Sequence, residues 1–174
     1  QDCNDFTAQY QVGRQLGKGS FGKVLEATHR ATNDASAVKV LQIGSPAGGI
    51  NAKLEKAAWA EERMWRRAGQ HENIVELRAT FSGSSRFYMV MEKCEQSMVE
   101  ALPKIMGHDG MGLTACFRQM LAAVAQVHSR HVVHRDVKPA NFLLGRDGKT
   151  LKLCDFGMAA QEPNDGQLLK GSYG

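Results

Sequence analysis

Three glycines near the start of the chain lie between two strand-like apolar runs, and this segment restricts the fold more than any other. Residues 16–24 read Leu-Gly-Lys-Gly-Ser-Phe-Gly-Lys-Val. Glycine allows a tight turn and lets backbone N–H groups approach phosphate oxygens. The triple-glycine pattern also occurs in dinucleotide-binding folds, where the third glycine opens a helix. Here the sequence after Val24 stays strand-like, which disfavours the dinucleotide fold. Two interpretations of residues 16–24 remain: a hairpin that covers phosphates, and an ordinary hairpin with a glycine turn.

The apolar pattern places strands before helices. Strand-like runs occupy residues 10–41, 74–81, 87–92, 142–144 and 151–154. Helical composition and spacing mark residues 52–68, 97–106 and 113–130. In the last of these, the apolar residues that recur at helical spacing are Phe117, Leu121, Val124 and Val127. We expect a short polar tail over residues 1–9 and a loop over 43–50. Strands followed by a helix-rich half indicate an α+β fold.

Composition excludes several classes of protein. The net charge is only +4, from 22 basic and 18 acidic residues that are scattered along the chain, which does not indicate nucleic-acid binding. The four cysteines, Cys3, Cys94, Cys116 and Cys154, form no C-x-x-C pair, so a zinc site is not predicted. Without a signal sequence, they suggest a reducing compartment, which makes the cytoplasm or nucleus the expected location. No apolar stretch is long enough to span a bilayer.

A lysine lies inside an apolar strand-like run. A buried ammonium is costly unless it is paired, and Lys39 could reach phosphates covered by the glycine segment. The ordinary alternative is an edge lysine that reaches solvent. The following helix offers Glu61 and Glu62 as partners. Glu61 is preferred because the apolar Met64 and Trp65 follow it at helical spacing, although Glu62 is not excluded.

A polar segment in the second half of the chain carries groups suited to phosphoryl transfer. Residues 134–141 read His-Arg-Asp-Val-Lys-Pro-Ala-Asn. This reaction needs positioning and charge neutralisation more than covalent chemistry. Asp136 would orient a substrate hydroxyl and accept its proton, Lys138 would neutralise the transferred phosphate, and Asn141 would hold Mg²⁺. His134 is predicted to pack in the core and not to act as a base.

An Asp-Phe-Gly tripeptide follows at residues 155–157. A carboxylate on a tight turn after a short strand suits Mg²⁺, which keeps few protein ligands, so Asp155 is predicted to bind the metal. Each motif alone is a weak signal, but their order along the chain makes coincidence a poor explanation.

With these motifs the chain resembles the eukaryotic protein kinase family over about residues 10–174. The resemblance implies a bilobal fold. Its N-lobe, about residues 10–93, would hold a five-stranded antiparallel sheet and one helix, and its incomplete helical C-lobe would span about 94–174. It also implies ATP and Mg²⁺ as cofactors and a protein substrate with a Ser or Thr hydroxyl, with no nucleic acid and no membrane span. The Lys-Pro-Ala-Asn ending resembles serine/threonine kinases, and residues 68–75 resemble the calcium/calmodulin-dependent group.

The resemblance implies roles for particular residues. The residues that would bind ATP are Leu16, Gly17, Lys18, Gly19, Ser20, Phe21, Gly22, Val24, Ala37, Lys39, Met91, Glu92, Cys94 and Leu143. Leu16, Val24, Ala37 and Leu143 would contact both faces of the adenine. Met91 would be the gatekeeper, and residues 92–94 would be the hinge that bonds the adenine edge. The catalytic set would be Lys39, Glu61, Asp136, Lys138 and Asn141, with Asn141 and Asp155 as metal ligands. A spine linking the lobes would consist of Trp65, Leu77, His134 and Phe156.

Two features depart from the family pattern. The family's A-P-E motif and its remaining helices do not occur in the 174 residues. We therefore expect these residues alone to be prone to aggregation. Whether they are active by themselves is left open. Residues 158–171 contain no Ser, Thr or Tyr that could be phosphorylated. We therefore hypothesise that Glu162 or Asp165 supplies the negative charge for Arg135.

Three functions are compatible with this resemblance, and an active serine/threonine kinase is the preferred one. A pseudokinase or truncated nucleotide-binding module is the alternative, although a pseudokinase would lack at least one of Lys39, Asp136, Asn141 and Asp155, all of which are present. The third function is that of a kinase-like enzyme acting on small molecules. It is disfavoured because the polar segment contains both the Arg135-Asp136 pair and the following Lys138-Pro139.

Overall fold

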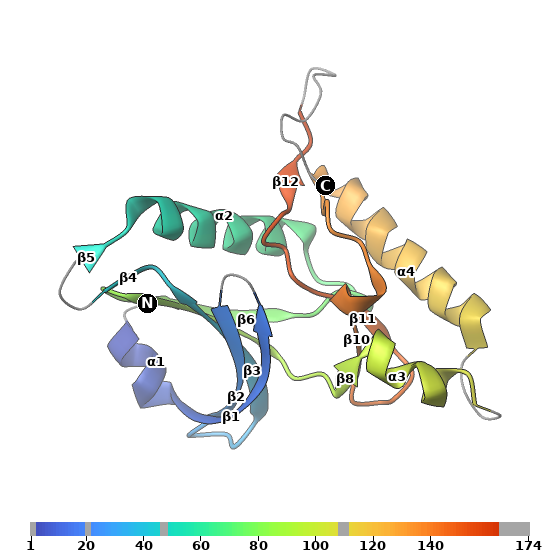
Figure 1. Cartoon of the computed structure of the whole chain (residues 1–174), viewed down its shortest axis with the longest axis horizontal. Helices are drawn as coiled ribbons and strands as arrows, with labels where there is room; N and C mark the ends of the chain where they lie inside the picture. Colours follow the sequence, from blue (N-terminus) through green and yellow to red (C-terminus); the bar gives the residue numbers. More distant parts are fainter. Residues whose placement is uncertain (1–2, 20–21, 46–48, 108–111, 164–174) are drawn as a thin grey trace. The chain divides into compact units, whose positions relative to one another are not determined.

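The computed structural model describes residues 3–19, 22–45, 49–107 and 112–163. The chain divides into two compact units, and Figure 1 traces its course through them. The N-terminal unit comprises Gln1–Glu62 and Glu76–Cys94, and the C-terminal unit comprises Arg63–Val75 and Glu95–Gly174. Residues 63–75, which were expected in the N-lobe, therefore group with the C-terminal unit.

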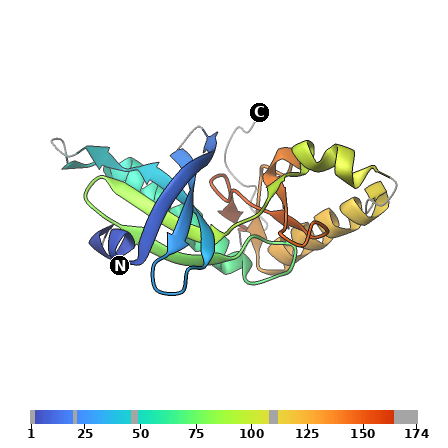
Figure 2. The same cartoon turned by 90° about the horizontal axis from the view of Figure 1, so that it is seen from below.

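A five-stranded antiparallel sheet forms the N-terminal unit, which confirms the predicted α+β class (Figures 1 and 2). Its strand order is β1-β2-β3-β7-β6. The strands are β1 (Tyr10–Gly19), β2 (Gly22–His29), β3 (Ala35–Gln42), β6 (Leu77–Ser82) and β7 (Arg86–Glu92). Where sequence predicted only a loop, β4 (Gly44–Ser45) and β5 (Gly49–Ile50) pair as a short ribbon.

The segment expected to be a polar tail is instead a helix that contributes to the core. Helix α1 (Cys3–Gln9) places Phe6, which is 1% exposed, against one face of the sheet. The Phe6 ring stacks on Tyr88 with centroids 4.3 Å apart and meets Phe81 edge-on at 5.6 Å. Val38 belongs to the same cluster. Because side chains alternate along a strand, the next residue, Lys39, points to the opposite face.

Helix α2 (Ala52–Ala68) forms over the predicted residues, and its first residues belong to the N-terminal unit. The C-terminal unit contains two further helices, α3 (Met98–Ile105) and α4 (Gly112–Ser129). Ser97 begins α3 with a capping box in which its hydroxyl accepts from the Glu100 N–H and the Glu100 carboxylate accepts from the Ser97 N–H. The cap explains why this helix starts where the sequence predicted.

Short strands complete the C-terminal unit. One sheet has the order β11-β10-β8 and another pairs β12 with β9. The elements are β8 (Gln96–Ser97), β9 (Val132–Val133), the 3₁₀ turn η1 (Pro139–Asn141), β10 (Phe142–Leu144), β11 (Leu151–Leu153) and β12 (Ala160–Gln161). Sequence predicted the β10–β11 hairpin but neither β8, β9 nor β12, which are two residues long and gain their pairing only from distant segments.

The predicted apolar face of α4 is only partly correct. Val127 is fully buried, but Phe117 is 56% and Leu121 68% exposed. The buried face passes instead through small residues, Cys116 and Ala123, at helical spacing with Val127. Small side chains let the helix axis approach β11 and β9 closely, so a core face need not consist of the largest apolar residues.

A buried asparagine holds β11 and α4 together. The Asn73 side-chain amide donates to Gln119 Oε1 and to the Leu151 carbonyl, each at 2.9 Å. Gln119 Oε1 also accepts from the Leu151 N–H at 2.7 Å. These bonds fix the strand that leads into the Asp155 turn. Among the helices of the described ranges, none is long and apolar enough to cross a membrane.

Candidate active site

The glycine segment is a hairpin between β1 and β2. Gly17 pairs with Val24 and Gly19 with Gly22. A Cβ at Gly22 would collide with the Val40 carbonyl oxygen, whereas a Cβ at Gly17 would meet nothing within 4 Å. Ser20 and Phe21 lie outside the described residues. Because a strand and not a helix follows the third glycine, the arrangement differs from the dinucleotide-binding pattern.

The lysine of β3 contacts the carboxylate that sequence favoured. Lys39 Nζ lies 2.6 Å from Glu61 Oε1, with side chains 13% and 5% exposed. Glu61 shares the buried side of α2 with Met64 and Trp65, as its spacing predicted. The open choice between Glu61 and Glu62 is thereby resolved in favour of Glu61 as the contact of Lys39.

Two of the predicted adenine contacts and the predicted gatekeeper share the sheet face of Lys39. Val24 lies opposite Lys39 on β2, and Ala37 lies opposite Met91 on β7. Directly opposed residues point to the same side of a sheet, and so do alternate residues of one strand. Val24, Ala37 and Met91 therefore form an apolar surface beside the ammonium.

The other two predicted adenine contacts have different surroundings. Leu16 on β1 is 37% exposed. Leu143 belongs to the C-terminal unit, where it is half-buried on β10 between Ser97 and Lys152.

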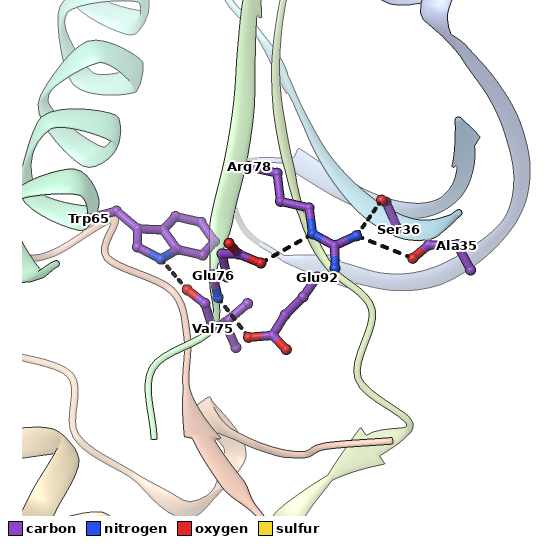
Figure 3. A network of polar contacts seen from close by, with 7 residues as sticks. All are labelled: Ala35, Ser36, Trp65, Val75, Glu76, Arg78 and Glu92. Atoms are coloured by element: carbon purple, nitrogen blue, oxygen red, sulfur yellow. Dashed lines mark hydrogen bonds and ion pairs between the residues drawn. The ribbon is translucent and has the colours of Figure 1, made fainter. Parts of the chain in front are cut away.

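Glu92, the last residue of β7, is held by a charged network that sequence reasoning missed (Figure 3). Glu92 and Glu76 bond twice: the Glu76 N–H donates to Glu92 Oε1 at 2.8 Å, and the Glu92 N–H donates to the Glu76 carbonyl at 3.0 Å. Arg78 donates through Nε to Glu76 Oε2 at 3.3 Å and through Nη1 to Ser36 Oγ at 3.0 Å. Arg78 lies at a bulge in β6, between the pairs of Leu77 and Ala79. No periodic pattern predicts a bulge, so the sequence carried no signal for this network.

Asp136, Lys138 and Asn141 come together in the C-terminal unit. Lys138 Nζ donates to Asp136 Oδ2 at 2.8 Å, and Asn141 Nδ2 donates to both the carbonyl and Oδ2 of Asp136, each at 2.8 Å. Asn141 is 7% exposed and sits on the η1 turn. The turn brings two polar groups of the segment, the Lys138 ammonium and the Asn141 amide, onto the Asp136 carboxylate, with the asparagine as its rigid support.

The contacts determine the charge state of this carboxylate. Burial acts to raise the pKa of Asp136, but hydrogen bonds from Lys138 and Asn141 together outweigh it, and the pKa falls below its usual range. The Asp136 carboxylate in turn raises the pKa of Lys138. At neutral pH the pair is a carboxylate beside an ammonium.

His134 is a packed residue, in agreement with its predicted role. It is 2% exposed, and burial lowers its pKa. Its Nδ1 accepts from the Asp136 N–H at 3.3 Å, so its Nε2 carries the proton that is donated to the Cys154 carbonyl at 3.0 Å. A neutral ring with both nitrogens engaged has no lone pair for a substrate proton, and instead supports the backbone of Asp136.

An aromatic stack supports the turn that carries Asp155. Phe156 is fully buried, with its ring 5.6 Å from that of Trp65 and 5.0 Å from that of His134. Trp65 fits the core because its indole N–H donates to the Val75 carbonyl at 2.7 Å (Figure 3). Three of the four predicted spine residues thus pack together in one unit. Asp155 has a φ of +63°, a strained backbone for a residue other than glycine that is held by its buried neighbour.

The side-chain oxygens of Asn141 and Asp155 are suitable ligands for a magnesium ion. Both N–H groups of the Asn141 amide are directed to Asp136, which leaves the amide oxygen as the group that could bind a cation. A neutral oxygen and a carboxylate are the hard ligands that Mg²⁺ prefers, with water and phosphate oxygens completing its shell. Among the described residues, no group of three or more His, Cys, Asp or Glu side chains could hold a metal ion.

Comparison with known proteins agrees with this geometry. The family model for the protein kinase domain matches residues 10–173. The chain belongs to the protein kinase family. It is 35% identical over 165 residues to CBL-interacting protein kinase 20 of Oryza sativa subsp. japonica, covering 88% of this chain and 34% of that protein.

Two other relatives of this kinase chain show similar values. Aurora kinase A-A of Xenopus laevis is 33% identical over 161 residues, which are 89% of this chain and 37% of that protein. Calcium/calmodulin-dependent protein kinase type II of Caenorhabditis briggsae is 33% identical over 175 residues, 99% of this chain and 32% of that protein. The kinase chain therefore spans about a third of the length of these relatives.

The residues after the Asp155 turn of this kinase chain are anchored to residues 131–135, just before and at the start of the polar segment. Glu162 Oε2 lies 3.2 Å from His131 Nδ1, and the Glu162 N–H donates to the His131 carbonyl at 2.9 Å. Arg135 donates through Nε to the Met158 carbonyl at 2.6 Å. Glu162, which was hypothesised to supply charge for Arg135, thus has a competing contact at His131. Asp165, the other candidate, lies outside the described residues.

Proposed function

We propose that this protein is a serine/threonine kinase that transfers the γ-phosphate of ATP to a Ser or Thr hydroxyl of protein substrates, with Mg²⁺. The observation that carries the proposal is the Asp136 cluster, in which one carboxylate accepts from both Lys138 and Asn141. An acceptor of fixed direction beside a cation is what phosphoryl transfer to a hydroxyl requires.

The N-terminal unit supplies groups for nucleotide binding. The Gly17–Gly22 hairpin offers backbone N–H groups that can lie close to phosphate oxygens. Lys39 would bind the α and β phosphates, and its contact with Glu61 holds the ammonium on the sheet face that carries Ala37 and Met91. The backbone of residues 92–94 would bond the adenine edge.

The C-terminal unit supplies the groups for transfer. Asp136 orients the substrate hydroxyl, and its lowered pKa makes it a weak base that takes the proton late in the transfer. Lys138 neutralises charge on the phosphoryl group as it moves. Mg²⁺ held by Asn141 and Asp155 would neutralise the charge of the phosphate oxygens. Lys138 also favours a serine/threonine over a tyrosine specificity, by the family resemblance of its position.

A nucleotide-binding module without activity of its own is the second candidate. This alternative concerns the 174 residues by themselves, which span about a third of the length of the relatives. Transfer of labelled γ-phosphate from ATP to a mixed Ser/Thr substrate protein separates the two. Kinase activity predicts transfer by the wild-type protein and none by Asp136→Asn, with an unchanged thermal shift on adding MgATP.

Two controls keep this test informative. Glu72→Gln removes an exposed carboxylate from the same unit and should transfer as the wild type does. Asp155→Asn should lose the Mg²⁺-dependent part of the thermal shift. A MgATP shift without any transfer would support the binding module. Absence of both would refute nucleotide binding altogether, and transfer by Asp136→Asn would refute the assigned role of that residue.

A further inference from the structure

A charge pair joins β2 to the residue that follows β7. Lys93 Nζ lies 2.6 Å from Glu26 Oε1, with side chains 28% and 26% exposed. The hydrogen bond from Lys93 is the main reason that the pKa of Glu26 lies below its ordinary value. The two residues are 67 positions apart in the sequence, so the contact is a product of the sheet and not of local structure.

The sheet is shaped to make room for this carboxylate. Val12 pairs with Ala27 and Gln15 with Leu25, so two residues of β1, Gly13 and Arg14, oppose Glu26 alone. A Cβ at Gly13 would lie 3.1 Å from Glu26 Cβ and 3.3 Å from its Oε2. The bulge therefore places a glycine where a larger residue would press on the carboxylate.

Arg14, the second residue of the bulge, also reaches Glu26. Its Nε lies 3.3 Å from Glu26 Oε1, and its side chain is 75% exposed. This contact is longer and far more solvated than that of Lys93, so the Lys93 contact is the stronger of the two.

The pair stands at the end of the row that carries the predicted adenine contacts. Glu26 lies opposite Ala37, and Ala37 lies opposite Met91, so the three side chains share one face. The preceding residue, Glu92, is bonded twice to Glu76, which directly precedes β6. In the strand order of the sheet, β2 and β6 lie on opposite sides of β7. Glu92 is therefore held toward β6 and Lys93 toward β2.

We propose that Glu26 and Lys93 are a positioning pair for nucleotide binding, which holds the hinge backbone at a fixed distance from the strand of the glycine hairpin. The proposal rests on the proposed ATP-binding function. A hinge that is ordered before the nucleotide arrives saves the cost of ordering it on binding. Neither side chain touches the nucleotide in this proposal, and the effect passes through the backbone of residues 92–94.

A merely structural surface pair predicts a different result. Such pairs contribute little to stability, so removing one partner should barely change unfolding. A positioning pair changes nucleotide affinity while leaving unfolding of the nucleotide-free protein nearly unchanged. The dissociation constant of each variant therefore separates the two roles, and an unchanged unfolding midpoint shows that a loss of affinity does not come from a loss of folding.

The experiment titrates a fluorescent ADP analogue into the wild-type protein and the variants Lys93→Met, Glu26→Gln and their double mutant. We expect each single variant to bind about two- to fivefold more weakly, the range that a partly exposed ion pair can supply. The double mutant should bind no more weakly than either single variant, because both remove the same contact. In a turnover assay, the loss should appear in KM for ATP and leave kcat unchanged.

Two matched variants complete the design. Arg14→Met removes the longer contact to the same carboxylate and should bind as the wild type does, and Lys93→Arg should retain most of the affinity. Equal affinity of Lys93→Met and the wild type would overturn the inference while leaving the kinase proposal intact. Additive losses in the double mutant would also overturn it. If the wild type binds no nucleotide analogue, the proposed function fails and the positioning role fails with it.

Discussion

Lys39 and Glu61 form a close ion pair, Nζ to Oε1 at 2.6 Å, in which both side chains are almost fully buried. The pair joins β3 to α2, two elements that no hydrogen-bond ladder connects. Removing one member of a buried pair leaves its partner's charge in a poorly solvated site, whereas removing both can be nearly neutral. The contact therefore specifies how the first part of α2, residues 52–62, lies on the sheet of the N-terminal unit as well as where the ammonium points.

We predict that Lys39→Met lowers the free energy of unfolding by about 3 kcal/mol, because the Glu61 carboxylate stays buried. The double variant Lys39→Met with Glu61→Gln should recover most of that loss, although it should not recover nucleotide binding. Chemical denaturation measures the first effect and the fluorescent ADP titration the second. Glu62→Gln is the matched control, with a change below about 0.5 kcal/mol. A larger loss in the Glu62 variant than in Lys39→Met would contradict the assignment of the pair.

Replacing Gly22 or Gly17 of the hairpin with alanine should have different effects, on stability in the first case and on nucleotide binding in the second. Gly22→Ala forces a Cβ against the Val40 carbonyl, so we expect the unfolding midpoint to fall and the β2–β3 pairing to weaken. Gly17→Ala places its Cβ in open space and should leave stability nearly unchanged. Its methyl group should instead weaken nucleotide binding, since it stands where phosphate would approach. Thermal unfolding with and without MgATP distinguishes the variants, and equal midpoints for both nucleotide-free variants would refute the packing argument.

The local chemistry of the site could be predicted from sequence because each motif is short and nearly continuous. Residues 134–141 contain Asp136, Lys138 and Asn141 within one turn of chain, so their contacts needed little knowledge of the fold. Helix α2 was predicted over its observed bounds because its composition favours helix throughout. The choice of Glu61 followed from the helical spacing of its apolar neighbours.

Contacts between distant segments could not be predicted. Lys93 meets Glu26 only because three strands align in one register, and Arg78 reaches Ser36 only because β6 contains a bulge. The buried face of α4 was misjudged because two stripes of the helix are apolar, and only the neighbouring strands determine which one is covered. Helix α1 was missed because a single large apolar residue, Phe6, is a weak periodic signal.

The unexpected helix α1 provides a stability test. Phe6 stacks on Tyr88 and is 1% exposed, so Phe6→Ala should reduce the free energy of unfolding by about 3 kcal/mol or more. Ala8→Gln changes an exposed residue of the same helix and should have little effect. Urea denaturation of both variants is sufficient. If Phe6→Ala unfolds at the wild-type urea concentration, the helix does not contribute to the core of the N-terminal unit.

His134 predicts a pH dependence of stability. Burial lowers its pKa in the folded state, so below the ordinary value of about 6.5 the unfolded chain takes up a proton that the folded chain refuses. Stability is therefore fully present above that pH and falls as the pH decreases toward the folded pKa, by at most about 1.4 kcal/mol per pH unit.

Denaturation between pH 7.5 and 5.5 tests the sign of this dependence. The slope should be smaller in His134→Asn than in the wild type. Equal slopes in the two proteins would show that another group is responsible. The absolute stability of His134→Asn is expected to be lower, since the Cys154 and Asp136 contacts are altered, so only the slopes are compared.

The exposed apolar stripe of α4 predicts the behaviour of the 174-residue chain in solution. Leu113, Phe117 and Leu121 recur every four residues, and their exposed fractions are 44%, 56% and 68%. A contiguous apolar stripe facing water promotes association. Phe117→Gln with Leu121→Gln should raise the soluble fraction and reduce light scattering, while the unfolding midpoint changes little because neither side chain is buried.

Val127→Gln, on the fully buried side of the same helix, should instead destabilise the fold. If the double variant scatters light as strongly as the wild type, association arises from another surface, and the half-exposed Val99 and Met106 of the α3 region would be the next substitutions to test.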